Sequence, residues 1–495
     1  MEECLLGIDI GTSACKVALF DFTGALLSHE TEEYPVFRPR PGWVEQNPDD
    51  WWGAVCKAAG RLLARSGIDA AGIAGIGIDG QSWSAIALGA DGNALGNTPI
   101  WLDTRASGIC RELDASIGKE RIFQLCGNPL SPSYTQPKLQ WYKRHKPELY
   151  EKIDKVLQSN SYIAYRLTGQ ITQDVSQGYG YFFFDARKGA YDEAMAREMG
   201  VDMSLLPPIF PCSEVIGYVT EEAAGLSGLC AGTPVVAGGL DAACGTLGAG
   251  VTKPGQTQEQ GGQAGGMSIC LDEYYADPRL IMGCHVVPGK WLLQGGTVGG
   301  GGVLKWLKES MFPDLSFEQM SAMAETVPPG ADGLVFLPYM LGERSPIWNP
   351  HAKGVFFGLD YSKTRAHIVR AAMEGVAFSL RHNIEVAEAA GAKLTTLNAM
   401  GGSSNSLIWT QIKSDVTAKR FIVPSSDNAT TLGAVILAGV GVGVWQNFED
   451  AVAQAVKISR EHTPSQENNE VYDKQYVIYR ELYENLKSIM GDVEK

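Results

Sequence analysis

Two apolar runs with a small polar turn between them open the chain. Residues 5–27 read LLGIDIGTSACKVALFDFTGALL, with a turn at Gly11-Thr12-Ser13 and another at Thr23-Gly24. Apolar runs joined by short turns of small residues predict β-hairpins. Asp9 ends the first run in otherwise apolar company, beside backbone N–H and hydroxyl groups. This pairing suits a metal ion and a phosphate, although an ordinary surface hairpin uses the same turn residues.

The next segments predict a helix and a strand. Asn47 and Pro48 are a typical helix cap and first helical residue, and apolar residues then recur at helical spacing until Gly67. A small apolar strand over residues 72–78 follows and ends at Asp79. Hairpin, helix and strand in alternation predict an α/β fold.

The second half of the chain restarts this plan. Residues 255–269 read as strand, glycine-rich turn and strand, with the turn at Gly262-Gln263-Ala264-Gly265. Helices are predicted over 303–311, 364–390 and 470–490. A repeated plan with low sequence identity indicates a duplicated protein of two domains with a cleft between them. We place these domains at residues 1–248 and 249–495.

Composition narrows the class of protein. The chain has 495 residues, of which 45% are hydrophobic and 20% charged, as in soluble globular proteins with two or more domains. The net charge of −15 argues against nucleic acid or an anionic membrane as the main partner. We expect no signal peptide and no membrane span. Ten cysteines without a C-x-x-C pair give no zinc signal and favour reduced thiols in a cytoplasm.

Three stretches carry candidate ligand chemistry. Trp101, Asp103 and Arg105 suit a polyhydroxyl ligand, because a ring covers C–H faces while carboxylate and guanidinium groups bind hydroxyls. The alternative there is a buried Trp beside a structural ion pair. Asp241 follows a buried strand and precedes small residues, which leaves room for a substrate at a strand end. The alternative is a helix cap.

Glycine-rich turns mark two further candidates in the second half. Residues 295–302 are almost all glycine and open a helix, so that Gly299 is a candidate phosphate contact. Close helix packing explains the same glycines equally well. The predicted strand from Leu397 leads into Gly401-Gly402-Ser403, a strand–turn–helix shape that is common at nucleotide sites.

Seven segments in register carry a family resemblance. They read GIDIGTSACKVALFD, GWVEQNPDDWW, PIWLDTRA, PKLQW, GGLDAACGTLGAG, FLPYMLGERSPIWNPHAKGVFFGL and GGSSNSLIWTQIKSD. Together they resemble the FGGY carbohydrate kinases, and within them the xylulokinase-like branch. The resemblance implies a duplicated actin-like (ribonuclease H-like) α/β fold whose two domains close around a central cleft. It also implies transfer of the γ-phosphate of ATP, with Mg²⁺, to a terminal hydroxyl of a ketose, for which D-xylulose is the expected substrate.

The resemblance assigns roles by matching position. Asp241 becomes the general base toward the attacking hydroxyl, and Asp9 holds Mg²⁺ through water. The sugar contacts fall on the first domain, at Gln81, Ser82, Trp83, Trp101 and Asp103. The nucleotide and its phosphates are assigned to Thr12, Ser13, Lys16, Gly262, Gln263, Gly265, Gly401, Gly402, Ser403 and Asn405. A homodimer is also consistent with the family.

Two departures from the branch keep other functions open. The second phosphate loop reads Gly-Gln-Ala-Gly, where xylulokinases usually have Gly-Thr-Ser-Gly. Ser82-Trp83 stands where the branch usually places Met-His against the sugar. The alternatives are a kinase for another ketose or polyol, such as ribulose, L-xylulose, erythrulose or glycerol, and a catalytically weak actin-like nucleotide-binding sensor.

Overall fold

The opening hairpin lies at the centre of a seven-stranded sheet in the computed structural model, which describes residues 3–426 and 428–494. Strand β1 (Cys4–Ile10) pairs antiparallel with β2 (Ala14–Phe20) and parallel with β5 (Ile73–Gly80). The sheet runs in the order β13-β14-β5-β1-β2-β3, and β15 also pairs with β5. The other strands are β3 (Leu26–Glu33), β13 (Val215–Tyr218), β14 (Pro234–Val236) and β15 (Gly239–Leu240).

The chain divides into two compact units that are not continuous in sequence. Unit 1 comprises the chain up to Thr252, Met282–Leu292 and Asn428–Val456. Unit 2 comprises Lys253–Ile281, the stretch from Leu293 to the gap at residue 427, and the chain from Lys457 onward. Two segments from the second half of the chain therefore belong to the unit that contains the opening hairpin.

Helix α1 (Pro48–Ser66) confirms the prediction from local signals. Asn47 accepts a hydrogen bond from the Asp49 N–H, Pro48 is the first helical residue, and Gly67 ends the helix with φ 69°. Its apolar face, which includes Trp51 and Val55, packs with the even-numbered residues of β1 in one core. The other helices of unit 1 that have eight or more residues are α2 (Ser107–Ser116), α3 (Lys119–Cys126), α4 (Thr135–His145), α6 (Ser159–Thr168), α9 (Asp241–Gly248), α14 (Ala429–Gly441) and α15 (Phe448–Ala455).

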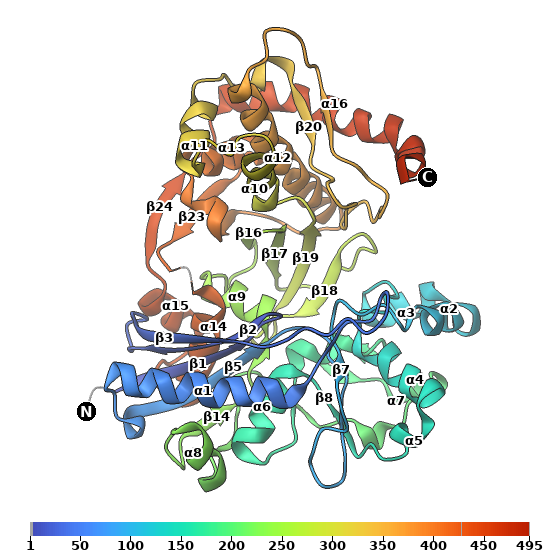
Figure 1. Ribbon diagram of the computed structural model, residues 1–495, viewed down its shortest axis with the longest axis vertical. Coiled ribbons are helices and arrows are strands. Elements are labelled where there is room, and N and C mark those ends of the chain that lie inside the picture. Colours follow the sequence, from blue (N-terminus) through green and yellow to red (C-terminus); the bar gives the residue numbers. More distant parts are fainter. Residues whose placement is uncertain (1–2, 427, 495) are drawn as a thin grey trace. The chain divides into compact units, whose positions relative to one another are not determined.

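The opposite face of the sheet is covered by α14 (Figure 1). The α14 backbone can approach the sheet and helix α9 closely because glycines lie at both contacts. A Cβ atom on Gly7 of β1 would lie 2.6 Å from the Thr431 carbonyl oxygen, and one on Gly77 of β5 would lie 1.8 Å from that of Ala434. A Cβ on Gly433 of α14 would lie 1.9 Å from the Cys244 oxygen of α9. The odd-numbered residues of β1 and β5 therefore face α14.

Unit 2 repeats the pattern of hairpin and parallel strand. Strands β16 (Gln256–Gly261) and β17 (Gly265–Leu271) form the hairpin, and β22 (Thr396–Met400) pairs parallel with β16. The sheet order is β18-β19-β17-β16-β22-β23-β24, and the chain passes from unit 1 to unit 2 within β19. The remaining strands of this sheet are β18 (Ile281–Cys284), β19 (Trp291–Thr297), β23 (Arg420–Pro424) and β24 (Ile458–His462).

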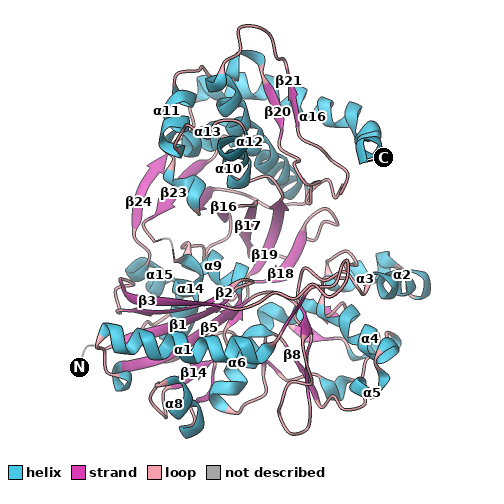
Figure 2. Cartoon of the chain, viewed as in Figure 1, coloured by secondary structure: helices cyan, strands magenta, loops and turns pink. Residues whose placement is uncertain are grey.

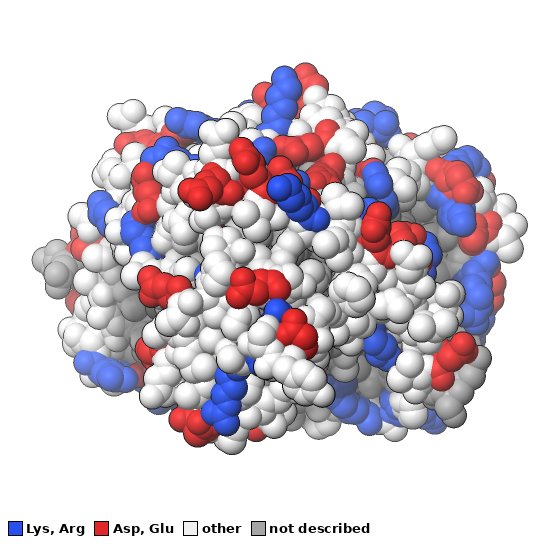
Figure 3. Space-filling view, turned by 90° about the horizontal axis from the view of Figure 1, so that it is seen from above, with Lys and Arg blue, Asp and Glu red and all other residues white. Residues whose placement is uncertain are grey.

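The helices of unit 2 lie close to their predicted ranges (Figure 2). Helix α10 spans Gly301–Ser310, α12 spans Arg365–Ala389 and α16 spans Gln466–Met490, where Ser465 caps an extra turn. With α11 (Phe317–Glu325) and α13 (Leu407–Thr417) they share one apolar core. No helix in the described part of the chain is long and apolar enough to cross a membrane. On the face drawn in Figure 3, acidic and basic side chains of the described residues are interspersed.

The close approach of α14 makes a stability prediction. Gly433→Ala inserts a methyl group against the α9 backbone, and overpacking of this kind costs about 1–3 kcal/mol. We expect the melting temperature to fall by about 2 °C or more in a thermal denaturation scan. Gly53→Ala in α1 is the matched control, because a Cβ at that position would have nothing within 4 Å, and we expect it to stabilise by about 0.5–1 kcal/mol. Equal stability of the two variants would show that α14 does not depend on glycine.

Candidate active site

Charged side chains form a row across three neighbouring strands of unit 1. In the parallel register of β1 and β5, Asp9 lies beside Asp79, and in the antiparallel register of β1 and β2 it lies beside Lys16. All three share the face of the sheet that α14 covers. Asp79 is fully buried, and Asp9 and Lys16 are half-buried. Analysis of the sequence identified Asp9 and Lys16 but missed Asp79.

A third carboxylate joins this row from a neighbouring strand. Asp241 is the first residue of α9 and follows β15 directly, and β15 pairs with β5 at Gly239↔Asp79 and Leu240↔Gly80. The alternative reading of Asp241 as a helix cap is wrong. The cap position is held by Leu240, and among the described residues the Asp241 carboxylate accepts a hydrogen bond only from the N–H of Ala242, at 2.6 Å. Its remaining oxygen is thus available to a substrate.

Burial and mutual repulsion shift the pKa values of these carboxyl groups. Burial, followed by the charge of Asp9, raises the pKa of Asp241 to about 7. Burial, together with the charges of Asp9 and Asp241, raises the pKa of Asp79 well above its ordinary value. Burial also raises the pKa of Asp9, whereas contact with Asp79 and the charge of Lys16 oppose that rise. All three shifts favour the neutral carboxyl group, and a bound cation would oppose them.

The Gly11-Thr12-Ser13 turn beside Asp9 is held through its carbonyl groups. The Tyr34 hydroxyl donates to the Gly11 oxygen at 2.5 Å, and Gln46 Nε2 donates to the Thr12 oxygen at 2.9 Å. The Ser13 oxygen accepts the Tyr34 N–H at 3.3 Å. A turn fixed by its carbonyl oxygens presents its N–H groups and hydroxyls in one arrangement, as an anion site requires.

Two predicted side chains flank this turn. Trp101 Nε1 donates to the Thr12 hydroxyl at 3.0 Å, so the predicted sugar contact and the predicted phosphate contact touch each other. Lys16 Nζ donates to Asn428 Oδ1 at 3.2 Å. Asn428 immediately precedes α14, so a segment from far along the chain positions this lysine.

The predicted sugar contacts continue in the segment after β5. Gln81 is buried and donates to Gly11 and Gln46, which joins this segment to the turn. Ser82 and Trp83 are half-buried, and Trp83 has a positive φ of 58°. Its ring stacks on Tyr134 at 4.1 Å and 17°.

The Trp83 backbone is held on both sides. Its N–H donates to Gln158 Oε1 at 3.1 Å, and its carbonyl oxygen accepts Lys138 Nζ at 2.8 Å. Lys138 is fully buried, and burial lowers its pKa to about 7. The sequence analysis quoted this lysine within the PKLQW motif but gave it no role.

An aromatic wall leads from Trp83 toward Asp241. The Tyr179 ring meets Trp83 edge to face at 5.5 Å, and the Asp241 charge contributes to a raised Tyr179 pKa whose main cause is burial. The indole N–H of Trp83 is buried and has no partner among the described residues. A hydroxylated ligand lying here would meet the half-buried Trp83 ring and the half-buried Asp241 carboxylate.

Asp103 occupies a different environment. Its carboxylate is fully buried and accepts the Val44 N–H at 2.7 Å and the Arg105 Nε–H at 2.9 Å. The Arg105 guanidinium lies 3.9 Å from the centre of the Trp43 ring. This geometry is that of the structural ion pair, which positions the loop that carries Trp101.

In unit 2 the predicted second phosphate loop packs directly on α10. The Gly301 N–H donates to the Gly262 oxygen at 2.7 Å, and the Gly302 N–H donates to the Gln263 oxygen at 3.0 Å. A Cβ on Gly300 would lie 2.4 Å from the Ala264 carbonyl carbon. Close packing therefore explains these helix-opening glycines, since two of the N–H groups are already used.

Two predicted contacts beside this loop are also closely packed. A Cβ on Gly299 would lie 2.5 Å from the Pro338 oxygen, and one on Gly265 would lie 2.5 Å from Thr297 Oγ1. Gln263 is exposed. The loop can therefore offer its long amide side chain to a ligand, in place of the hydroxyl that the family usually has there.

The predicted adenosine turn lies between β22 and α13. Gly401 has φ 84°, a Cβ on Gly402 would meet nothing within 4 Å, and Asn405 is exposed. Behind the turn, Lys413 Nζ donates to Glu259 Oε1 at 2.6 Å and to the Ser403 hydroxyl at 2.7 Å. This buried ion pair joins β16 to the turn. The sequence signal for it is a lysine among buried positions of an apolar helix.

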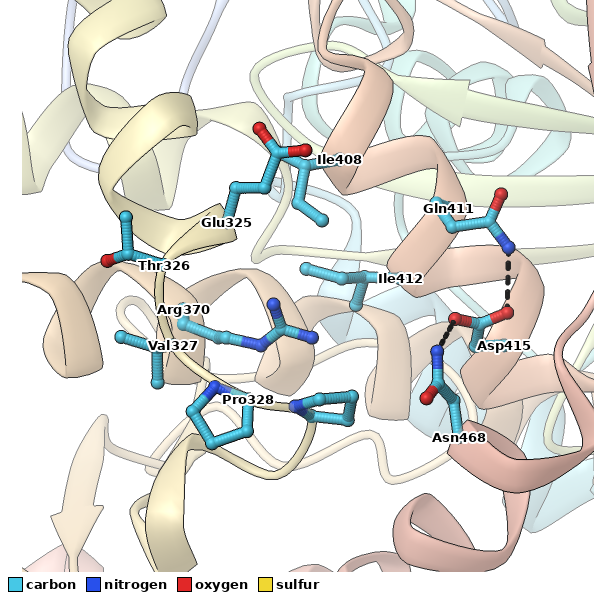
Figure 4. Close-up of a pocket in the computed structure, with 11 residues that line it drawn as sticks. Glu325, Thr326, Val327, Pro328, Arg370, Ile408, Gln411, Ile412, Asp415 and Asn468 are labelled. Atoms are coloured by element: carbon cyan, nitrogen blue, oxygen red, sulfur yellow. Dashed lines mark hydrogen bonds between the residues drawn. The ribbon is translucent and has the colours of Figure 1, made fainter.

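The cavity drawn in Figure 4 lies elsewhere in unit 2 and is about 460 Å³ in volume. None of the predicted nucleotide contacts lines it. Its Asp415 accepts hydrogen bonds from Gln411 and Asn468, each at 2.8 Å, and its Arg370 donates to Glu374 at 2.8 Å. Because these groups already satisfy one another, the cavity offers a ligand little polar recognition.

Comparisons with known proteins show the family of this chain. Residues 4–248 match the N-terminal domain of the FGGY family of carbohydrate kinases, and residues 279–442 match its C-terminal domain. The xylulose kinase of Escherichia coli (strain K12) is 31% identical, with 98% of this chain and all of that protein covered. The gluconokinase of Bacillus subtilis (strain 168) is 28% identical, with 100% and 99% covered. The crystal structure of xylulose kinase from Rhodospirillum rubrum superposes with a TM-score of 0.90 at 30% identity, covering 99% of this chain and 100% of that one.

The buried ion pair of unit 2 makes a testable prediction. Lys413→Met leaves Glu259 buried without a cation, which costs about 3–5 kcal/mol. We expect a large fall in the melting temperature and weaker binding of ATP by calorimetry, because Ser403 also loses a donor. The double variant Lys413→Met/Glu259→Met removes both charges and should recover much of the stability. If the double variant is as unstable as the single one, the pair is not the cause.

Proposed function

Because this chain belongs to the FGGY family of carbohydrate kinases, we propose that it transfers the γ-phosphate of ATP to a terminal hydroxyl of D-xylulose. The chain is a carbohydrate kinase with the two-domain actin-like α/β fold of that family. Full-length similarity to proteins named xylulose kinase supports the choice of a ketose. The observation that carries the proposal is the half-buried carboxylate of Asp241, with one oxygen available and a pKa of about 7.

Asp241 is the general base in this proposal. A carboxylate whose pKa lies near neutral pH can accept the proton of the attacking hydroxyl as the bond to phosphorus forms, and a base of this kind typically contributes about 10²–10⁴-fold. Phosphoryl transfer otherwise depends on positioning and charge neutralisation. Trp83, Tyr134 and Tyr179 exclude water on the sugar side, which limits hydrolysis of ATP.

ATP and Mg²⁺ are the proposed cofactors. Asp9 would hold Mg²⁺, which would supply charge neutralisation at the phosphates. The donor set fits, because carboxylate oxygens in a net negative setting suit a hard cation. No group of three or more His, Cys, Asp or Glu side chains in the described chain is placed to enclose a metal, so phosphates and water would complete its coordination.

The remaining contacts belong to the nucleotide. Lys16, with the N–H and hydroxyl groups of Thr12 and Ser13, lies toward the γ-phosphate. In unit 2 the proposed contacts are Gly262, Gln263, Gly265, Gly299, Gly401, Gly402, Ser403 and Asn405. In this proposal the sugar binds to residues 1–248 and the nucleotide mainly to residues 249–495.

A second candidate function rests on Trp83. Trp83 stands where the branch usually has a histidine, and its ring stacks on Tyr134. A different ketose or a polyol, such as ribulose, L-xylulose, erythrulose or glycerol, fits an aromatic wall with a single indole donor.

The cytoplasm is the proposed location, since the described cysteines form no disulfide. A homodimer stays a prediction.

A coupled ADP-release assay tests the substrate. The panel contains D-xylulose, L-xylulose, D-ribulose, L-ribulose, erythrulose, glycerol and D-gluconate, each with MgATP. We expect the highest kcat/KM with D-xylulose, at least tenfold above the others, because the chain is similar over its full length to proteins named xylulose kinase. A preference for another sugar or polyol would show that D-xylulose is not the substrate, while the assignment as a kinase would stand. Turnover with none of them would favour the nucleotide-binding sensor.

Substitution of Asp241 tests the base. Asp241→Ala should lower kcat by at least 10²-fold and leave ATP affinity, measured by calorimetry, within about twofold. In the parent enzyme, Asp241 is protonated below its pKa of about 7. We therefore expect kcat/KM to fall as the pH drops below about 7, tenfold per pH unit. A variant rate within tenfold of the parent, or a pH profile that is flat from 5 to 8, would show that Asp241 is not the base.

A further inference from the structure

Asp79 differs from the other buried carboxylates of unit 1. It is fully buried, and neither of its side-chain oxygens has a hydrogen-bond donor among the described residues. Asp174, equally buried in the same unit, shows the usual solution: its oxygens accept Asn160 Nδ2 at 2.8 Å and the Gln177 N–H at 2.9 Å. A buried carboxylate without donors is costly, because desolvation is not compensated.

The surroundings of Asp79 explain what its oxygens meet. Its register partner is Asp9, and the two carboxylates lie within hydrogen-bonding reach of each other. Neither carboxylate carries a fixed hydrogen to donate. Only a shared proton or a cation can therefore sit between them and be attracted to both.

The fold keeps other donors away from this point. On the face of the sheet that Asp9 and Asp79 share, the preceding residues of β1 and β5 are Gly7 and Gly77, which contact the α14 backbone. Lys16 is the nearest cation in the register, but its ammonium group donates to Asn428. Two carboxylate ligands are a protein contribution that Mg²⁺ commonly takes, since it keeps waters and phosphate oxygens in its other positions.

We propose that Asp79 is a second carboxylate ligand of the divalent cation and shares it with Asp9. This inference rests on the proposed function, in which Asp9 binds the Mg²⁺ of MgATP. It adds a residue from β5 to the site and makes the parallel register of β1 and β5 part of the metal site. The competing explanation is a purely structural pair of carboxyl groups that share one proton.

Metal binding distinguishes the two explanations. Binding of Mn²⁺–AMPPNP is followed by water-proton relaxation in the full-length parent, Asp79→Asn and Asp9→Ala. Asp69→Asn is the matched control, because it removes one exposed carboxylate of the same unit at a cap position that Asn also fills. We expect the dissociation constant of the metal complex to rise at least tenfold in Asp79→Asn and Asp9→Ala, and to stay within twofold in the control.

Other outcomes separate the inference from the proposed function. If Asp9→Ala loses the metal and Asp79→Asn stays within twofold of the parent, the inference is wrong and the Mg²⁺ role of Asp9 stands. If neither variant changes, both metal assignments are wrong. Sugar turnover by the parent reports on the kinase activity independently of either result.

Thermal unfolding supplies a second readout that does not depend on activity. In EDTA, Asp79→Asn removes a buried charge, so its melting temperature should equal or exceed that of the parent, and Mg²⁺ should raise the melting temperature of the parent only. If both Asp79→Asn and Asp79→Ala melt below the parent in EDTA, the carboxyl pair stabilises the metal-free fold through a shared proton. That result would overturn the inference.

Discussion

The parallel pairing of β1 with β5 is the constraint on which the rest of the site depends. Its register sets Asp9 beside Asp79, and the pairing of β15 with β5 then brings Asp241 to the same edge. Three carboxylates at low exposure carry a large desolvation cost that Lys16 offsets only in part. A fold keeps such a group when the gain lies in binding and catalysis, which is the usual trade between stability and activity.

The α14 segment makes this arrangement possible. It belongs to unit 1 although it lies near the end of the chain, and glycines on β1, β5 and α9 let its backbone rest against theirs. Asn428, just before the helix, holds Lys16. Residues that would bind phosphate therefore depend on packing between segments that are separated by most of the sequence, so distant core substitutions can disturb the site.

The sequence predictions that were confirmed depended on local signals. The cap at Asn47, the proline after it and Gly67 act within one turn of α1, so its ends could be predicted. The α/β class followed from alternating periodicity, and the family from seven ordered motifs. Asp79 was missed because its role depends on the pairing of β5 with a distant strand. In the sequence alone, an aspartate at the end of a strand cannot be distinguished from an ordinary turn residue.

The sequence left alternative roles open for several residues, and the backbone geometry distinguishes between them. The hypothesis that Asp241 is a helix cap is wrong because Leu240 holds the cap position. The glycines that open α10 are explained by two N–H groups that bond the neighbouring turn, which composition alone does not show. The return of residues 428–456 to unit 1 could not be predicted either, since periodicity identifies a helix but not the sheet it covers.

In the proposed mechanism, one row of carboxylates formed by Asp9, Asp79 and Asp241 supplies both the base and the metal ligands. Anomalous diffraction at the manganese edge, from crystals grown with Mn²⁺–AMPPNP and D-xylulose, would locate the ion and the sugar together. We expect a manganese peak beside Asp9 and Asp79, at direct or water-bridged distance, with a sugar hydroxyl in hydrogen-bond contact with Asp241. A manganese peak held by other residues, or a sugar whose hydroxyls all lie away from Asp241, would contradict this mechanism.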